Sequence, residues 1–278
     1  MLVVPLDTVA TQRLENPRNG VFFFQRPLAG LEGAVDNFSL ELVRTENDFY
    51  SPRHKHNFDQ VRFQLDGMFE FSRDGKMTPG KVGFFPEGTP YGPQTCPGPS
   101  LVLVLQFGGA SGSGFMSKEQ LHQGVQSLKE RGTVSNGVFT WTDASGATYN
   151  KDSYEAVWEM VFGKALSYPA ARYDRPFLMD PANFKWMPTG NAGVTEKFLG
   201  SFSERKTTIR MVRLEPGARC TLRGNEILFI VTGKGYAGDE AYSARTSIHL
   251  KADELAVLQA ETETEMLCID IPPTVHIS

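Results

Sequence analysis

Apolar and polar residues alternate with a period of two in the first β-like part of the chain, from about residue 37 to residue 107. This alternation is typical of strands, and the Asp66-Gly67 pair is typical of a hairpin turn. The predicted strands of this region are residues 38–44, 60–65, 82–85 and 101–107. The last of them is continuously apolar, as expected for a strand that is covered on both faces.

Helix signals follow this region. Ser117 and Gln120 form a capping-box pattern that predicts a helix ending near Arg131. Asp152 predicts a second helix over residues 153–162, which has apolar positions on one face.

The chain between and after these helices predicts a hairpin around residues 143–146 and an extended connection over residues 168–188. Strand patterns then return from about residue 197 to residue 272. The predicted strands are residues 208–214, 226–231, 246–250, 254–258 and 266–271.

Composition supports a β protein and removes several functions. The 278 residues include 27 Gly, 17 Pro and 20 Phe, which suits short strands around an aromatic core better than a helical bundle. A net charge of −4 disfavours binding of nucleic acid, and no apolar run reaches the roughly 18 residues of a membrane span. The N-terminus lacks a signal-peptide pattern, and Cys96, Cys220 and Cys268 are scattered, so we expect a cytoplasmic protein without disulfides.

The histidines give the first chemical signal. His54 and His56 are separated by one residue, so on a strand they face the same side, whereas His122, His249 and His276 are isolated. Imidazole is a common ligand of transition metals, so the pair is a candidate metal site.

The two β regions also repeat each other. Gly67 follows Gln60 by seven residues, and Gly233 follows Glu226 by the same spacing. A later strand follows in both regions, and we therefore predict two similar β modules in one chain.

These motifs resemble those of the cupin superfamily, an HxH pair with a later glutamate and glycine, then a glycine, a PxG and a third histidine. The matching residues are His54, His56, Gln60 and Gly67, followed by Gly80, Pro86, Gly88 and Tyr91. The resemblance implies an all-β bicupin of two jelly-roll barrels (double-stranded β-helices) with a few connecting helices. It places the N-terminal barrel at 1–115, a helical and extended connection at 116–190, and the C-terminal barrel at 191–278.

The family usually supplies three histidines and one glutamate to a metal. The resemblance implies that His54, His56, Gln60 and Tyr91 hold a divalent transition metal, which could be Fe, Mn, Ni, Zn or Cu. Gln60 replaces the glutamate and Tyr91 the third histidine, so the ligand set is weaker than usual. The alternative is a site without a metal, in which the histidines form local hydrogen bonds.

The second module departs further from the family pattern. Cys220 and Leu222 stand at the HxH positions and Thr264 near the last ligand position, while Glu226 keeps the glutamate place. We therefore predict that the C-terminal module has lost its site and is structural.

The strand after the HxH pair carries the other candidates. Gln60, Arg62 and Gln64 share one face of this strand. Because Gln60 stands at the position of the family's glutamate, the resemblance implies that this face points into the barrel. The alternative is that Val61, Phe63 and Leu65 form the core face and the polar residues face solvent.

Several residues are assigned roles on this basis. Arg62 is expected to act in catalysis by attracting an anionic substrate, or to pair with Glu41. Tyr91 is a general acid, a ligand or a wall of the pocket. Substrate-binding roles are predicted for Gln64, Gln94 and Glu41.

Three functions are compatible with these residues. The first is a metal-dependent cupin enzyme, a dioxygenase, isomerase or lyase, that acts on a small anionic organic molecule. The others are a non-catalytic bicupin that binds a small molecule, and a metal-free acid–base isomerase that uses His54 and Tyr91. The expected partner is a small molecule, with no nucleic acid and no membrane. Exposed sheet edges favour a homodimer or two barrels that cover each other.

Overall fold

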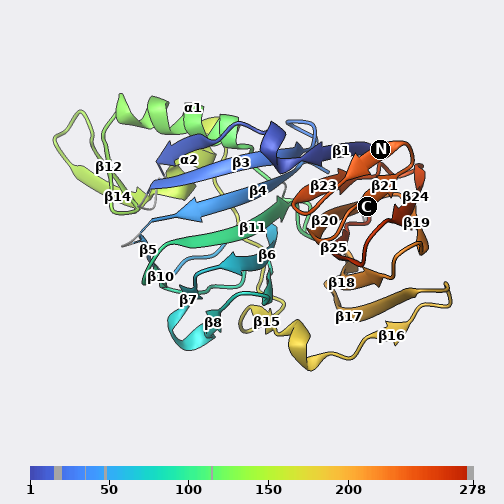
Figure 1. The fold of residues 1–278 in the computed structure, drawn as a ribbon. Coiled ribbons are helices and arrows are strands. Elements are labelled where there is room, and N and C mark those ends of the chain that lie inside the picture. The colour runs from blue at the N-terminus through green and yellow to red at the C-terminus, as the bar shows by residue number, and fades with distance from the viewer. Residues whose placement is uncertain (16–20, 35, 47–48, 114, 274–278) are drawn as a thin grey trace. The chain divides into compact units, whose positions relative to one another are not determined.

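The computed structural model describes residues 1–15, 21–34, 36–46, 49–113 and 115–273 (Figure 1). The chain divides into two compact units. The first contains residues 11–24 and 29–178, and the second contains residues 1–10, 25–28 and those from 179 onward. The predicted ranges 1–115, 116–190 and 191–278 differ from this division, because the first residues of the chain pair with strands of the C-terminal unit.

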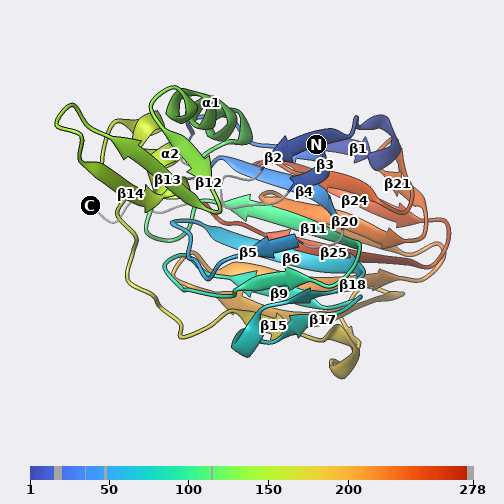
Figure 2. The same cartoon turned by 90° about the vertical axis from the view of Figure 1, so that its left-hand side faces the viewer.

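The first unit is built on two antiparallel sheets. The larger has the order β15-β9-β6-β11-β4-β3-β2, and Figure 2 shows β4, β11, β6 and β9 side by side. Its strands are β2 (Gln12–Glu15), β3 (Val21–Ala29), β4 (Phe38–Thr45), β6 (Asp59–Asp66), β9 (Val82–Phe85), β11 (Ser100–Phe107) and β15 (Phe177–Met179). The smaller sheet consists of β5 (Phe49–Ser51), β10 (Gln94–Cys96), β7 (Phe69–Glu70) and β8 (Lys76–Met77), and a short 3-10 helix, η2, covers Ser72–Asp74.

An apolar core lies inside this barrel and draws on both sheets, with Val43 and Val102 from the larger and Phe49 and Phe69 from the smaller. Strand β6 is buried on both of its faces, since Val61 and Arg62 are 1% and 8% exposed. Both interpretations of its alternation are thus partly right: the apolar residues are buried, and so are the polar ones.

The chain that follows β11 forms a cap, which we define as residues 115–162. It contains helix α1 (Lys118–Lys129), helix α2 (Ser153–Phe162) and a three-stranded sheet of β12 (Thr133–Ser135), β13 (Val138–Thr142) and β14 (Thr148–Asp152). The predicted capping box is confirmed, as Ser117 and Gln120 exchange both hydrogen bonds, and Asp152 caps α2. The cap has a core of its own that includes Val125, Leu128 and Trp158.

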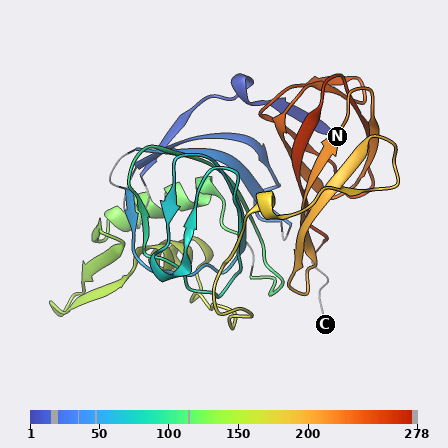
Figure 3. The same ribbon diagram turned by 60° about the horizontal axis from the view of Figure 1, so that its bottom comes forward.

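The second unit repeats the barrel architecture (Figure 3). Its larger sheet has the order β1-β23-β20-β25-β18-β17-β16 and its smaller sheet the order β19-β24-β21-β22. The strands of the larger sheet are β1 (Leu2–Pro5), β23 (Thr246–His249), β20 (Glu226–Thr232), β25 (Thr264–Asp270), β18 (Thr207–Leu214), β17 (Val194–Phe202) and β16 (Met187–Pro188). Those of the smaller sheet are β19 (Arg219–Arg223), β24 (Leu255–Ala260), β21 (Gly235–Ala237) and β22 (Glu240–Tyr242).

Two 3-10 helices, η1 (Leu6–Thr8) and η3 (Pro181–Asn183), complete the second unit. Residues 168–188, predicted to be extended, therefore also contain η3 and two short strands. Strand β1 was not predicted and pairs with β23, from Leu2 opposite His249 to Pro5 opposite Thr246. None of the helices in the described ranges is long and apolar enough to cross a membrane.

Candidate functional site

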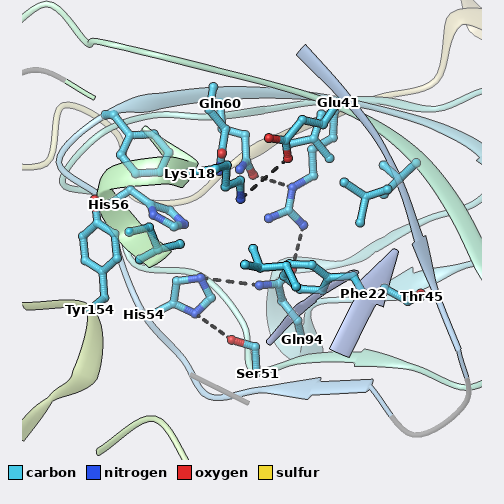
Figure 4. Close-up of a pocket in the computed structure, with 18 of the residues that line it drawn as sticks. Phe22, Glu41, Thr45, Ser51, His54, His56, Gln60, Gln94, Lys118 and Tyr154 are labelled. Atoms are coloured by element: carbon cyan, nitrogen blue, oxygen red, sulfur yellow. Dashed lines mark hydrogen bonds and ion pairs between the residues drawn. The ribbon is translucent and has the colours of Figure 1, made fainter. Parts of the chain in front are cut away.

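A cavity of about 140 Å³ lies inside the N-terminal barrel (Figure 4). Polar side chains from strands and loops line one part of it, and apolar side chains line the rest. The polar lining residues are Glu41, Thr45, Ser51, His54, His56, Gln60, Arg62, Gln94, Gln106 and Lys118. Most of the predicted site residues are therefore brought together in one space.

The strand register explains why they meet. Arg62 on β6 lies between Val104 on β11 and Gly83 on β9, and Glu41 on β4 lies opposite Val104 from the other side. Residues paired in this way point to the same face of a sheet. Arg62 and Glu41 consequently face the cavity from strands two positions apart, separated by about 10 Å of sheet.

Arg62 is the centre of the polar part. Its Nε donates to Gln60 Oε1, its Nη1 to Gln94 Oε1 at 2.6 Å, and its Nη2 to the Tyr91 hydroxyl at 3.0 Å. The guanidinium carbon lies 4.5 Å from the centre of the Phe85 ring. These contacts hold the planar group in one orientation.

The charge of Arg62 has no carboxylate partner among the described residues. Glu41 instead accepts a hydrogen bond from Ser39 at 2.8 Å and lies 3.6 Å from Lys118 Nζ. The expectation that Arg62 pairs with Glu41 is therefore wrong. Burial lowers the pKa of Arg62, opposed by the nearby Tyr91, but arginine keeps its proton at neutral pH. A buried charge of this kind is costly unless an anion compensates it.

Tyr91 links Arg62 to the two histidines. Its hydroxyl lies 3.2 Å from His54 Nε2 and 2.7 Å from His56 Nε2, and its backbone exchanges two hydrogen bonds with the backbone of His54. Tyr91 is only 1% exposed and does not line the cavity, so it lies behind the two rings rather than on the wall. The Tyr91 hydroxyl therefore reaches the cavity only through the side chains of His54, His56 and Arg62.

Gln94 fixes the orientation of His54. Since Gln94 Oε1 accepts from Arg62, its amide nitrogen faces His54 Nε2, at 3.4 Å. The other ring nitrogen of His54, Nδ1, lies 2.6 Å from the carbonyl oxygen of Pro52, to which it donates. This arrangement leaves Nε2 of a neutral His54 as an acceptor.

Gln64, which was predicted to bind substrate, does not line the cavity. Its amide donates to Ser100 Oγ at 2.7 Å and to the carbonyl of Asp66 at 2.6 Å. Gln64 shares a face of β6 with Arg62, but Asp66 and Ser100 hold its side chain at the end of the strand. His122 and His249 lie away from the site, on α1 and β23, and His276 lies outside the described residues.

Sequence reasoning missed the cap as part of the site. Phe115, Met116, Lys118, Leu121 and Tyr154 all line the cavity. The capping box located α1 correctly, but nothing in its local pattern indicates that it packs over the barrel.

Comparison with known proteins supports the same architecture. No family model and no curated protein matches the chain. Among solved structures, a "putative dioxygenase" of Nostoc punctiforme aligns with a TM-score of 0.63 at 11% identity, over 99% of this chain and 84% of its own. GK1651 of Geobacillus kaustophilus aligns with a TM-score of 0.56 at 13% identity, over 100% of this chain and 97% of its own. Oxalate decarboxylase of Bacillus subtilis aligns with a TM-score of 0.55 at 11% identity, over 98% of this chain and 76% of its own.

The chain has the bicupin fold. Its neighbours include proteins described as enzymes, and the oxalate decarboxylase is described as having Mn(II) centres. At 11–13% identity these likenesses establish the fold of this chain and not its reaction.

The residues of this site do not fit the metal that the fold implies. The described residues contain no group of three or more His, Cys, Asp or Glu side chains that could hold an ion. The oxygens of Gln60 and Gln94 already accept from Arg62, and the Nε2 atoms of both histidines face Tyr91. A divalent cation there would also meet the positive guanidinium without a carboxylate to offset the repulsion.

The C-terminal barrel of the bicupin contains its own arginine. Arg210 on β18 forms ion pairs with Glu226 and, at 3.4 Å, with Glu196. Cys220 and Cys268 lie in the apolar core of this barrel, and burial raises the pKa of the Cys268 thiol above its usual value. The Arg210 charge is thus compensated within the chain, unlike that of Arg62.

We expect Glu226→Gln to lower the free energy of unfolding by about 1–3 kcal/mol, because it removes one carboxylate from a mostly buried pair. Denaturant unfolding at neutral pH measures this loss. The double variant Arg210→Met/Glu226→Leu should recover much of it, since apolar replacement removes both charges. A single variant as stable as the wild type would show that the pair contributes nothing.

Proposed function

We propose that the N-terminal barrel binds a small organic carboxylate at Arg62 and transfers a proton to or from it, as a cupin enzyme of the isomerase or lyase type that needs no metal. The observation that carries this proposal is a buried guanidinium that faces a cavity and has no acidic partner among the described residues.

The donors of Arg62 support the binding part. A guanidinium has five N–H groups, and three of those on Arg62 donate to side chains. The other two, one on each Nη, are available to a ligand in the cavity. Two parallel N–H groups match the two oxygens of a carboxylate, and such charge-assisted pairs are among the strongest hydrogen bonds in proteins.

The histidines and Tyr91 support the chemical part. His54 lines the inner cavity and also an outer groove that includes Arg53, Lys55 and Glu155. From His54, the Tyr91 hydroxyl leads to His56, which lines the cavity. The three groups form a hydrogen-bonded path along which a proton can pass between the groove and a bound substrate. Histidine suits this role because it exchanges protons near neutral pH.

A metal-dependent dioxygenase or decarboxylase is the second candidate, and the fold comparisons favour it. The candidate ligands do not support a metal-dependent activity, because the oxygens of Gln60 and Gln94 and the Nε2 atoms of His54 and His56 are already used in hydrogen bonds within the chain.

Exchange in D₂O tests the proposed function. Mandelate, incubated with chelator-treated protein, should gain deuterium at the carbon next to its carboxylate, as measured by NMR. His56→Gln should slow the exchange about 100-fold or more, whereas His122→Gln, at an exposed position of α1, should not change it. Binding without exchange would contradict the proposed enzymatic activity and indicate a non-catalytic binding protein. Exchange that occurs only after a metal is added would favour the metal-dependent enzyme.

A further inference from the structure

The inner surface of the cavity defines the kind of carboxylate that it can hold, an inference that rests on the proposed function. Away from Arg62, the walls consist of aliphatic side chains from the strands, such as Val43, Val102 and Val104, and of Phe22, Phe49 and Phe69. An apolar cavity of roughly 150 Å³ is known to hold one benzene-sized molecule. A space of about 140 Å³ therefore suits a single ring or a short branched chain.

The other charges in the cavity limit the ligand to one negative group. Lys118, carried by α1, lies 3.6 Å from Glu41, so the pair is neutral as a whole. Arg62 is then the one uncompensated cation among the described lining residues. A second carboxylate, as in a dicarboxylic acid, would compete with Glu41 for Lys118 or meet the apolar walls.

The edge of the cap forms the wall that limits the size of the ligand. Met116 and Leu121 line the cavity, and Met116 is 4% exposed. Several contacts hold α1 in place: Ser117 Oγ donates to Glu32 at 2.8 Å, and Gly124 lies so close to α2 that a Cβ there would be 2.8 Å from Val157. These contacts tie α1 to the loop before β4 and to the rest of the cap, and they place Met116 and Leu121 at the cavity.

We propose that Met116 and Leu121 are specificity-determining residues that select ring-sized monocarboxylates over longer ones and over dicarboxylates. This preference differs from the substrate in the name of the oxalate decarboxylase neighbours, because oxalate has two carboxylates and no apolar part.

Calorimetric titration of the full chain with acetate, benzoate, 3-phenylpropionate and terephthalate tests this proposal. Benzoate should bind at least tenfold more tightly than the other three. Leu121→Ala should raise the affinity for 3-phenylpropionate relative to benzoate at least tenfold, and Leu121→Phe should weaken benzoate binding. Met116→Ala gives a second enlargement if Leu121→Ala does not fold.

Leu128→Ala is the matched control, because Leu128 is buried on the same helix but does not line the cavity. It should leave the ligand preference unchanged. If benzoate binds but Leu121→Ala and Met116→Ala keep the wild-type preference, the specificity assignment is wrong while the proposed function stands. If no carboxylate binds the wild type, both fail.

Discussion

Arg62→Met is expected to weaken benzoate binding about 100-fold, the largest effect on ligand binding that we predict. The variant removes the two N–H groups that we propose bind the carboxylate, and the only uncompensated positive charge among the described residues of the cavity. A charge-assisted pair of hydrogen bonds is worth about 3 kcal/mol, which corresponds to this loss of affinity. Isothermal titration calorimetry measures it directly.

Two further variants separate charge from geometry. Arg62→Lys keeps the charge but loses the planar fork, so its affinity should lie between those of the wild type and Arg62→Met. Arg44→Met removes an exposed arginine of β4 that stacks on Phe23, outside the cavity, and should not alter binding. Full affinity in a folded Arg62→Met variant would refute the binding role of Arg62.

Phe58→Ala is expected to cost about 3–5 kcal/mol of unfolding free energy, the largest effect on stability that we predict. Phe58 is 3% exposed and joins the barrel to the cap, with ring centres 5.2 Å from Phe115 and 4.4 Å from His56. Its loss leaves a void at the place where the Tyr154 hydroxyl also donates to Asn57, at 3.0 Å.

Urea unfolding followed by tryptophan fluorescence suits this test, since two of the three tryptophans, Trp141 and Trp158, lie in the cap. Leu31→Ala, at a position that is 77% exposed, should change stability by less than about 0.5 kcal/mol. A Phe58→Ala variant that unfolds like Leu31→Ala would show that the cap does not depend on this contact.

Most strands of the two barrels could be predicted from local sequence patterns. Alternation predicted β4 and β6, a continuous apolar run predicted β11, and the repeated spacing around Gln60 and Glu226 predicted two modules. The pairing of β1 with β23 was missed, because it joins residues more than 240 positions apart and nothing within β1 itself encodes the partner.

The candidate site was predictable in part from local sequence. Gln60 and Arg62 share a face of β6, and the family pattern indicated His54 and His56, which lie between β5 and β6; all four meet Gln94 and Glu41 in one cavity. The contacts that depend on tertiary packing were not predicted: Asp66 and Ser100 hold Gln64 outside the cavity lining, Lys118 gives Glu41 a partner, and Tyr91 lies behind the histidines. The family pattern predicted a metal at these positions, whereas the structure gives the oxygens of Gln60 and Gln94 to Arg62.

The central claim, that Arg62 rather than a metal is the cation of this site, is tested most directly by benzoate titration of the wild-type protein after chelation, with elemental analysis of the same sample. We predict one benzoate bound per chain, because the Arg210 charge in the C-terminal barrel is already paired with Glu226. We also predict the same affinity with and without chelator, and well under about 0.1 equivalent of Fe, Mn, Ni, Zn or Cu. Stoichiometric metal whose removal abolishes benzoate binding would contradict the account.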